Sequence, residues 1–330
     1  MKTATRLRMI HIGMMGILLL SPAAHAASYS FSSLAVPFVG AADTNPTGIN
    51  KSGTVVGWYQ PAPSTADQSF VEENGTYSIL NVPFQGAVGT IARGINNYGT
   101  IVGSYGDLQG EHGFVDNGGV FTPINVPFAG ASNVSVTGIN NKGVLVGVYQ
   151  DSSGIYHSFV DNGGTFTSFD LPLALGGGTA LAAGINDSGQ IIGTYGSYQA
   201  FLATPAVPSI MIFTSISAPG SVWNWGVGIN NDGAIVGNEA YLDASTGVPK
   251  ISGFVEQGGT YTVINDPHAP VVTNISGIND NGVIVGTYSN SGTSYAFIAA
   301  PVPEPSVWLE LIVGLGLVAS ALGNRGRKTR

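Results

Sequence analysis

Two histidines stand at matching places in the chain, each four residues before an aspartate. His112 precedes Asp116, and His157 precedes Asp161. Histidine and carboxylate groups can bind a metal ion or transfer protons. A stable metal site needs three or four ligands, however, so a turn-capping or surface role fits these two histidines as well. We expect no bound metal ion or other cofactor.

Acidic side chains recur at the position of these two aspartates. The set is Glu72, Glu73, Asp116, Asp161 and Glu256. Paired carboxylates can cleave glycosidic bonds, and a partial ring of them can hold Ca²⁺. Solvated acids also gather at hairpin ends, and the sequence gives no distance between any two of these groups. Both interpretations therefore stay open.

Aromatic residues accompany the acids, at the ends of short aliphatic runs. They are Tyr59, Tyr105, Tyr149, Tyr195 and Tyr288, with Trp58, Trp223 and Trp225 nearby. Such rings can stack on sugars or fill the space between sheets. The candidate ligand-facing residues are Asp116, Asp161, Tyr105, Tyr149, His112 and His157. We assign no catalytic, metal-binding or cofactor-binding residue, because no phosphate loop, Ser-His-Asp pattern or dinucleotide fingerprint occurs.

The chain repeats one motif six times: Gly-Ile-Asn, two polar residues, Gly, one variable residue, two aliphatic residues and Gly. The copies begin at Gly48, Gly94, Gly138, Gly184, Gly228 and Gly277, at spacings of 46, 44, 46, 44 and 49 residues. A period of this size indicates an array of identical supersecondary units. Each copy is typical of a β-hairpin, with a turn between two short strands that ends in Gly.

Residues 90–128 show the content of one complete unit. Four strands are expected, over 90–96, 100–105, 113–116 and 120–126, with Asn117-Gly118 as a two-residue turn. The segment 31–41 matches the last strand of such a unit, whereas the sixth unit stops after its third strand, at Ile298. Pairing of these two ends completes the last unit and closes a ring.

This arrangement predicts an all-β fold, a six-bladed β-propeller of four-stranded blades closed by the N-terminal strand. An open β-solenoid is the alternative, but it needs capping ends and leaves both terminal strands unexplained. Small residues before Gly-Ile-Asn, such as Thr47 and Ala183, fit strands that crowd around an axis. Arg93 is the exception.

The composition excludes some partners. The 330 residues include 48 Gly, 18 Pro, no Cys and only 9% charged residues, with a formal net charge of −8. Short strands joined by tight turns fit this composition, and packing and strand pairing alone must hold the fold. Between residues 27 and 302 only Lys51, Arg93, Lys142 and Lys250 are basic. An acidic body repels phosphate backbones, so we expect no nucleic-acid partner.

The two ends differ from the repeats. Residues 1–26 have a basic start, an apolar run and an Ala-His-Ala exit, which predicts a signal peptide. A permanent anchor would need a longer apolar run. The propeller is expected over residues 27–300. The tail, residues 301–330, contains Pro303-Glu304-Pro305, a mostly apolar run over 307–322 and a basic end.

The tail resembles the PEP-CTERM sorting signal, which has the same three parts in the same order. The resemblance implies a hydrophobic sorting helix that inserts transiently in the inner membrane, and an exosortase-type enzyme that recognises the tail near the Pro-Glu-Pro triplet. It also implies an exopolysaccharide-producing bacterium and a place at the cell surface or in the extracellular matrix. An anchor that is never cut is the alternative.

The repeats resemble the HAF family of extracellular repeat proteins, named for a His-Ala-Phe triplet. The triplets here are His112-Gly-Phe114, His157-Ser-Phe159, Gln68-Ser-Phe70, Gln199-Ala-Phe201, Ser252-Gly-Phe254 and Tyr295-Ala-Phe297. The resemblance covers residues 28–298 and implies a surface location but no established activity. We therefore expect a non-catalytic exported propeller that binds exopolysaccharide or a matrix protein. A polysaccharide hydrolase or lyase using rim carboxylates such as Asp116 or Asp161 is the alternative.

Overall fold

The computed structural model describes residues 28–39, 41–61, 66–207, 210–243, 246–269 and 271–302. The expected signal peptide and the expected sorting helix lie outside these residues. In the described part of the chain, no helix has the length and apolar character that crossing a membrane requires.

Strands make up nearly all the regular structure of the described residues, because short β-branched and aromatic runs alternate with Gly-containing turns. One 3₁₀ turn, η1 (Leu173–Leu175), is the exception there. The first four repeats form four separate four-stranded antiparallel sheets. Their strands are β2 (Ala42–Ile49), β3 (Val55–Gln60), β4 (Gln68–Glu73), β5 (Thr76–Leu80), β6 (Thr90–Ile95), β7 (Ile101–Asp107), β8 (Gly110–Asn117), β9 (Val120–Ile124), β10 (Ser132–Ile139), β11 (Leu145–Gln150), β12 (Tyr156–Asn162), β13 (Thr165–Phe169), β14 (Ala180–Ile185), β15 (Ile191–Tyr195), β16 (Gln199–Val207) and β17 (Ile210–Ile216).

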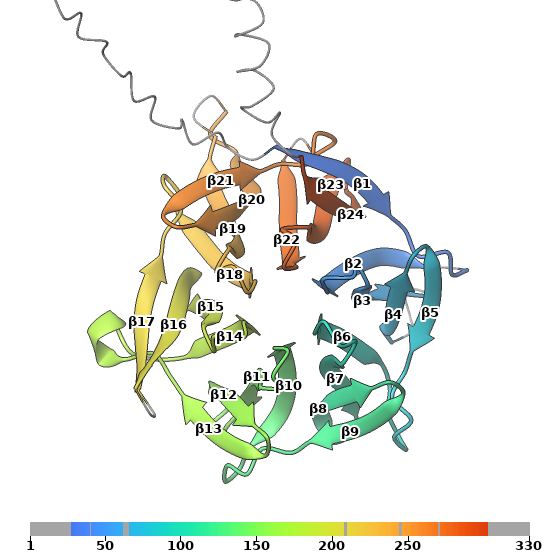
Figure 1. Ribbon diagram of the computed structural model, residues 1–330, viewed down its shortest axis with the longest axis vertical. Helices are drawn as coiled ribbons and strands as arrows, with labels where there is room; N and C mark the ends of the chain where they lie inside the picture. The colour runs from blue at the N-terminus through green and yellow to red at the C-terminus, as the bar shows by residue number, and fades with distance from the viewer. Residues whose placement is uncertain are drawn as a thin grey trace, which may run out of the picture.

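The remaining strands form one eight-stranded sheet. It contains two four-stranded groups joined by a single parallel bridge, between Ile251 and Val272. The groups are β18 (Trp223–Ile229), β19 (Ile235–Leu242), β20 (Pro249–Gln257) and β21 (Thr260–Ile264), then β22 (Val272–Ile278), β23 (Ile284–Asn290), β24 (Thr293–Pro301) and β1 (Tyr29–Leu34). Figure 1 shows all these strands arranged radially about a central axis, with the first strand of each repeat innermost. This is the β-propeller architecture that the sequence predicts.

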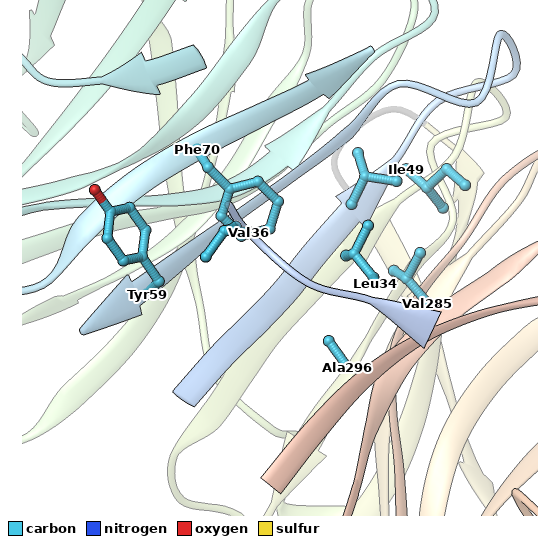
Figure 2. Packing of buried hydrophobic residues seen from close by; sticks show 8 residues of the cluster. Leu34, Val36, Ile49, Tyr59, Phe70, Val285 and Ala296 are labelled. Atoms are coloured by element: carbon cyan, nitrogen blue, oxygen red, sulfur yellow. The ribbon is translucent and has the colours of Figure 1, made fainter. Parts of the chain in front are cut away.

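The N-terminal strand completes the last group of strands, as predicted. β1 pairs antiparallel with β24, from Tyr29 opposite Pro301 to Leu34 opposite Ala296. The side chain of Leu34 then packs with Ile49, Val285 and Ala296 in an apolar core between the first and sixth repeats (Figure 2). The two ends of the described chain are therefore joined by both backbone pairing and side-chain burial.

The phenylalanine of each triplet on the third strand is fully buried. These residues are Phe70, Phe114, Phe159, Phe201, Phe254 and Phe297. Each belongs to an apolar core between neighbouring repeats. Burial of one such ring contributes about 1.5–3 kcal/mol, so the six rings together contribute strongly to the contacts between repeats.

A β-bulge interrupts the first strand of every repeat, directly before Gly-Ile-Asn. The pairing with the second strand skips one residue each time, namely Thr47, Arg93, Thr137, Ala183, Val227 and Ser276. A bulge leaves its extra residue unpaired and redirects its side chain. In this fold the six bulged residues line the axial channel.

Two glycines of the motif are required by close contacts. A Cβ atom at Gly103 would overlap the carbonyl oxygen of Ile91, beside the bulge. A Cβ atom at Gly138 would lie 3.1 Å from the Cα atom of Gly184 in the next repeat. The motif's last glycine therefore makes room for the bulge, and its first lets the innermost strands meet around the axis.

Candidate functional site

A cavity of about 610 Å³ lies at the end of the axial channel where the first strands begin. Its walls combine one cation, two aromatic rings, and amide and hydroxyl groups, and none of its lining residues is acidic. Among the lining residues are Arg93, Trp225, Tyr198, Asn45 and Asn274. This mixture of flat apolar and hydrogen-bonding groups suits a polar organic ligand.

Arg93 is the bulged residue of the second repeat. Its Nε donates to Ser104 Oγ over 3.4 Å, and its Nη2 donates to Glu111 Oε1 over 3.2 Å. The side chains of Arg93 and Glu111 are each 35% exposed. A half-exposed ion pair of this kind contributes only about 0–1 kcal/mol. The pair therefore orients the guanidinium without fixing it strongly.

Tyr198 and Trp225 form an aromatic pair at the cavity. Their ring centroids lie 6.0 Å apart, with 60° between the planes. Tyr198 has a φ of 62°, a left-handed conformation that costs a non-glycine residue roughly 1–2 kcal/mol. The backbone N–H of Asn224 donates to its carbonyl over 2.9 Å. Strained backbone conformations are frequent at functional sites. Here the conformation places the exposed ring of Tyr198 at the mouth of the cavity.

Arg93 and Trp225 approach the cavity from opposite walls. Arg93 belongs to the second repeat and Trp225 to the fifth. Consecutive repeats are neighbours around the axis, and the sixth repeat joins the first through β1 and β24. The second and fifth repeats are therefore three repeats apart in either direction around the ring, which places Arg93 and Trp225 on opposite sides of the axis.

The opposite end of the channel is narrow and internally hydrogen-bonded. Its cavity measures about 60 Å³ and is lined by the Ile of all six motifs and the Asn of the last five, with Asn97, Asn141, Asp187, Asn231 and Asp280. Burial would raise the pKa of Asp280, but hydrogen bonds from Asn231 and Asn97 and the charge of Lys51 lower it overall. Several polar groups at this end are hydrogen-bonded to one another.

Four of the five predicted acidic candidates cap turns, and the fifth, Glu73, is exposed. Asp116 Oδ1 accepts the backbone N–H of Gly119, and Asp161 Oδ1 that of Gly164, each over 2.7 Å. Glu72 and Glu256 bind Gly75 and Gly259 in the same way. Asp116 and Asp161 are buried rather than solvated at the hairpin ends. Contact with a ligand stays a prediction for them, and the structure gives them a capping role.

The predicted histidines bind acids of their own repeats. His112 Nε2 lies 2.9 Å from Asp107 Oδ1, and His157 Nδ1 lies 2.9 Å from Asp170 Oδ2. Burial lowers the pKa of His157, but the hydrogen bonds and charges of Asp170 and Asp151 outweigh it and raise that pKa overall. In the part of the chain that the structure describes, no three His, Asp or Glu side chains form a metal-binding group.

The predicted tyrosines lie between repeats. Tyr105 packs on Phe84 of the preceding repeat with ring centroids 4.9 Å apart, and Tyr149 packs on Phe128 at 4.8 Å. Their other faces stack on His112 and His157, respectively. Both tyrosines are buried. They therefore fill the space between sheets, and the structure does not bring them to the axial cavity.

Sequence reasoning missed part of the axial site. Trp225 was among the aromatic candidates, but Tyr198, Asn45 and Asn274 were not. The one feature of the sequence that pointed to this site was Arg93. It is the only charged residue at the position directly before Gly-Ile-Asn, where the other repeats carry smaller uncharged residues. Tyr198 gave no signal, because its place at the cavity depends on a short hairpin between β15 and β16.

No family model and no curated protein matches the sequence. Among solved structures, the chain is similar to Trypanosoma rangeli sialidase, at 10% identity and a TM-score of 0.47, over 87% of this chain. The chain spans 58% of the length of that sialidase. It is also similar to the Aleuria aurantia lectin, at 12% identity and a TM-score of 0.48, over 81% of this chain and 99% of the lectin. A thermostable family-43 glycoside hydrolase matches at 10% identity and a TM-score of 0.32, over 82% of this chain and 97% of that enzyme. Likeness at this level carries no inference about ligand or activity.

Proposed function

We propose that this chain is an exported, non-catalytic six-bladed β-propeller that binds polysaccharide in its axial cavity. The count of six adds the two groups of the eight-stranded sheet to the four separate sheets. The observation that supports binding is the pair of rings, Trp225 and Tyr198, beside amide and guanidinium donors in a cavity of about 610 Å³.

Carbohydrate fits these walls for a physical reason. A sugar ring has C–H faces that pack on an aromatic ring and hydroxyl groups at its edge that need hydrogen-bond partners. Trp225 and Tyr198 offer the first kind of surface, and Asn45, Asn274 and Arg93 offer the second. A matrix protein is the less suitable partner, because these groups lie in a cavity rather than on a flat apolar face.

The same walls favour binding over cleavage. Hydrolysis of a glycosidic bond generally uses two carboxyl groups, one on either side of the bond. None of the residues lining the cavity is acidic, and the nearby Glu111 is paired with Arg93. Asp116 and Asp161, the carboxylates that suggested a hydrolase or lyase, each hold a turn.

The proposed location depends on the two chain ends. The basic and apolar start predicts export, and the Pro303-Glu304-Pro305 tail resembles a signal for sorting by an exosortase-type enzyme. A surface or matrix position would place the axial cavity beside exopolysaccharide. Transient insertion of the tail in the inner membrane is part of this proposal.

The test compares two neighbouring tryptophans on an array of neutral and acidic polysaccharides. Trp225 lines the cavity, whereas Trp223, two residues earlier and 46% exposed, is absent from its lining. We expect Trp225→Ala to weaken binding at least about tenfold, as loss of a stacking ring does, and Trp223→Ala to bind like the wild type. Incubation of the polysaccharides with the protein should release no new reducing ends, because a non-catalytic protein does not cleave glycosidic bonds. Equal binding by both variants would refute the axial site, and sustained release of reducing ends would refute the non-catalytic function.

A further inference from the structure

We propose that the axial cavity selects polysaccharides that carry carboxylates, with Arg93 binding the carboxylate and Glu111 competing for the same guanidinium. This inference depends on the saccharide binding proposed above and names the chemical class of its ligand. It begins from the distribution of positive charge. Of the four basic residues between positions 27 and 302, Arg93 alone lines the cavity.

The other three cations lie elsewhere. Lys51 and Lys142 follow Gly-Ile-Asn, in turns at the opposite end of the channel. Lys250 Nζ pairs with Asp243 Oδ2 over 2.6 Å, at the hairpin between β19 and β20. The net charge of −8 opposes the approach of an anionic polymer, so a carboxylate that binds in the axial cavity must be held by the one cation there, Arg93.

The propeller does not need arginine at this bulge. In the first and third repeats the bulged residue is a threonine that ties its repeat to the next. Thr47 Oγ1 donates to the carbonyl of Ala92 over 2.8 Å, and Thr137 Oγ1 to that of Ala182 over 2.9 Å. The hydrogen bonds of Arg93 instead go to Ser104 and Glu111 in its own repeat. Its side chain serves the cavity rather than the contact between repeats.

The guanidinium can accept a ligand carboxylate. Arginine has five N–H donors, and the two bonds above use two of them. Its planar fork matches a carboxylate in a two-point contact, and such bonds are about twice as strong as neutral ones. Glu111 contacts Nη2 through one oxygen at 3.2 Å, and both partners are 35% exposed. A ligand carboxylate can bind beside Glu111 or displace it.

The aromatic wall supplies the second point of recognition. Trp225 faces the cavity from the repeat opposite Arg93, with Tyr198 beside it. A chain of uronic acids would place a carboxylate against Arg93 and the face of a sugar ring against Trp225. A neutral chain would keep the contact with Trp225 and would have no charged group to pair with Arg93. Arg93 therefore determines selectivity, and Trp225 contributes to binding of both kinds of polymer.

The experiment uses three polyuronates of different linkage, polygalacturonate, polymannuronate and polyglucuronate, each with its carboxyl-reduced neutral counterpart. Binding to the full chain is measured at constant ionic strength. For at least one pair, the wild type should prefer the acidic polymer by roughly tenfold or more. Arg93→Gln removes the charge but keeps a hydrogen-bond donor for sugar hydroxyls, so it should abolish that preference by weakening binding of the acidic polymer roughly tenfold and binding of the neutral polymer much less. Glu111→Gln should strengthen binding of the acidic polymer, because it removes a competing carboxylate.

Lys142→Gln, which removes the same charge at the opposite end of the channel, is the matched control and should change neither affinity. If the neutral polymers bind as tightly as the acidic ones, or if Arg93→Gln behaves like Lys142→Gln, carboxylate selection is wrong and saccharide binding stands. Dextran sulfate is anionic but carries no carboxylates. If it binds as tightly as a polyuronate, carboxylate selection is also wrong. If no polymer of either kind binds, the proposed function fails with it.

Discussion

The side-chain amide of Asn279 donates a hydrogen bond of 2.8 Å to the backbone carbonyl of Asn50, across 229 residues of chain. The same bond, from the Asn of one Gly-Ile-Asn to the carbonyl of the next, joins four further pairs of repeats. They are Asn96 to Asn140, Asn140 to Asn186, Asn186 to Asn230 and Asn230 to Asn279. Five of the six motifs are therefore hydrogen-bonded to the next motif in this way, and the bond from Asn279 joins the last repeat to the first.

Replacing Asn279 should destabilise the fold more than replacing its neighbour Asn281. Asn279 is buried, and its Oδ1 also accepts the backbone N–H groups of Asn281 and Val283. Asn279→Ala leaves several buried groups unpaired, so we expect a loss of about 2–4 kcal/mol in the free energy of unfolding. Asn281→Ala removes one exposed bond, to the carbonyl of Lys51, and should cost under about 1 kcal/mol. Urea denaturation measures both free energies of unfolding, and equal losses would show that the bond from Asn279 to Asn50 contributes no more than an exposed one.

Deleting residues 27–40 should cause aggregation rather than the loss of a free end. The deletion removes β1, exposes the edge of β24 and takes Leu34 from the apolar core with Ile49 and Val285. Open sheet edges recruit other chains. Thermal unfolding with light scattering should show a lower midpoint and early scattering. A monodisperse sample with unchanged melting would contradict the closed ring.

Gly103 and Gly106 lie in the same strand and should differ sharply in their tolerance of alanine. A Cβ atom at Gly103 would overlap the carbonyl oxygen of Ile91, which is backbone and cannot move aside. At Gly106 the nearest atom would be the carbonyl oxygen of Val88, 3.4 Å away. We expect Gly103→Ala to cost more than about 3 kcal/mol or to prevent folding, and Gly106→Ala to cost under about 1 kcal/mol. Comparable melting temperatures for the two variants would refute the account of the bulge.

The sequence predicted the strands and the closure of the ring but not the residues that meet at the cavity. The period, the Asn-Gly turns and the orphan strands at both ends specified the four-stranded unit and the pairing of β1 with β24. The direction of the side chain at the bulge could not be predicted from the sequence, because the alternation of side chains along a strand does not place Arg93 on the axis. Asp116 looked like an exposed acid, since a hydrogen bond to Gly119 leaves no mark in a sequence. Residues from different repeats, such as Arg93 and Trp225, meet at one cavity only once the ring is closed.

The stability of the protein should fall as the pH rises through the titration of His157. Burial lowers the pKa of this imidazole, but Asp170 and Asp151 raise it above its ordinary value of 6.5 in the folded state. A group with a raised folded pKa contributes stability that is complete below its unfolded pKa and is lost as the pH passes its folded pKa. We therefore expect the urea midpoint to decline above about pH 6.5. His157→Gln should flatten that decline, and an unchanged pH profile in the variant would contradict the role of the ion pairs.

Glu239 should destabilise the fold at neutral pH, because it occupies a place that suits a tyrosine. The other repeats carry Tyr59, Tyr105, Tyr149, Tyr195 and Tyr288 at this point of the second strand. Glu239 is only 6% exposed, and among the described residues no hydrogen bond to its carboxyl group is found. Burial raises the pKa of its carboxyl group, since burial disfavours the charged form.

The raised pKa of Glu239 determines how its effect on stability changes with pH. Stability contributed by a carboxyl with a raised folded pKa is complete below about pH 4.5 and is lost as the pH rises through the folded value. Glu239→Gln should therefore be more stable than the wild type at pH 7, and the two should converge as the pH approaches 4. Glu73→Gln, at an exposed position, is the control and should track the wild type throughout. A constant difference between Glu239→Gln and the wild type from pH 4 to pH 8 would show that the carboxylate charge is not the cause.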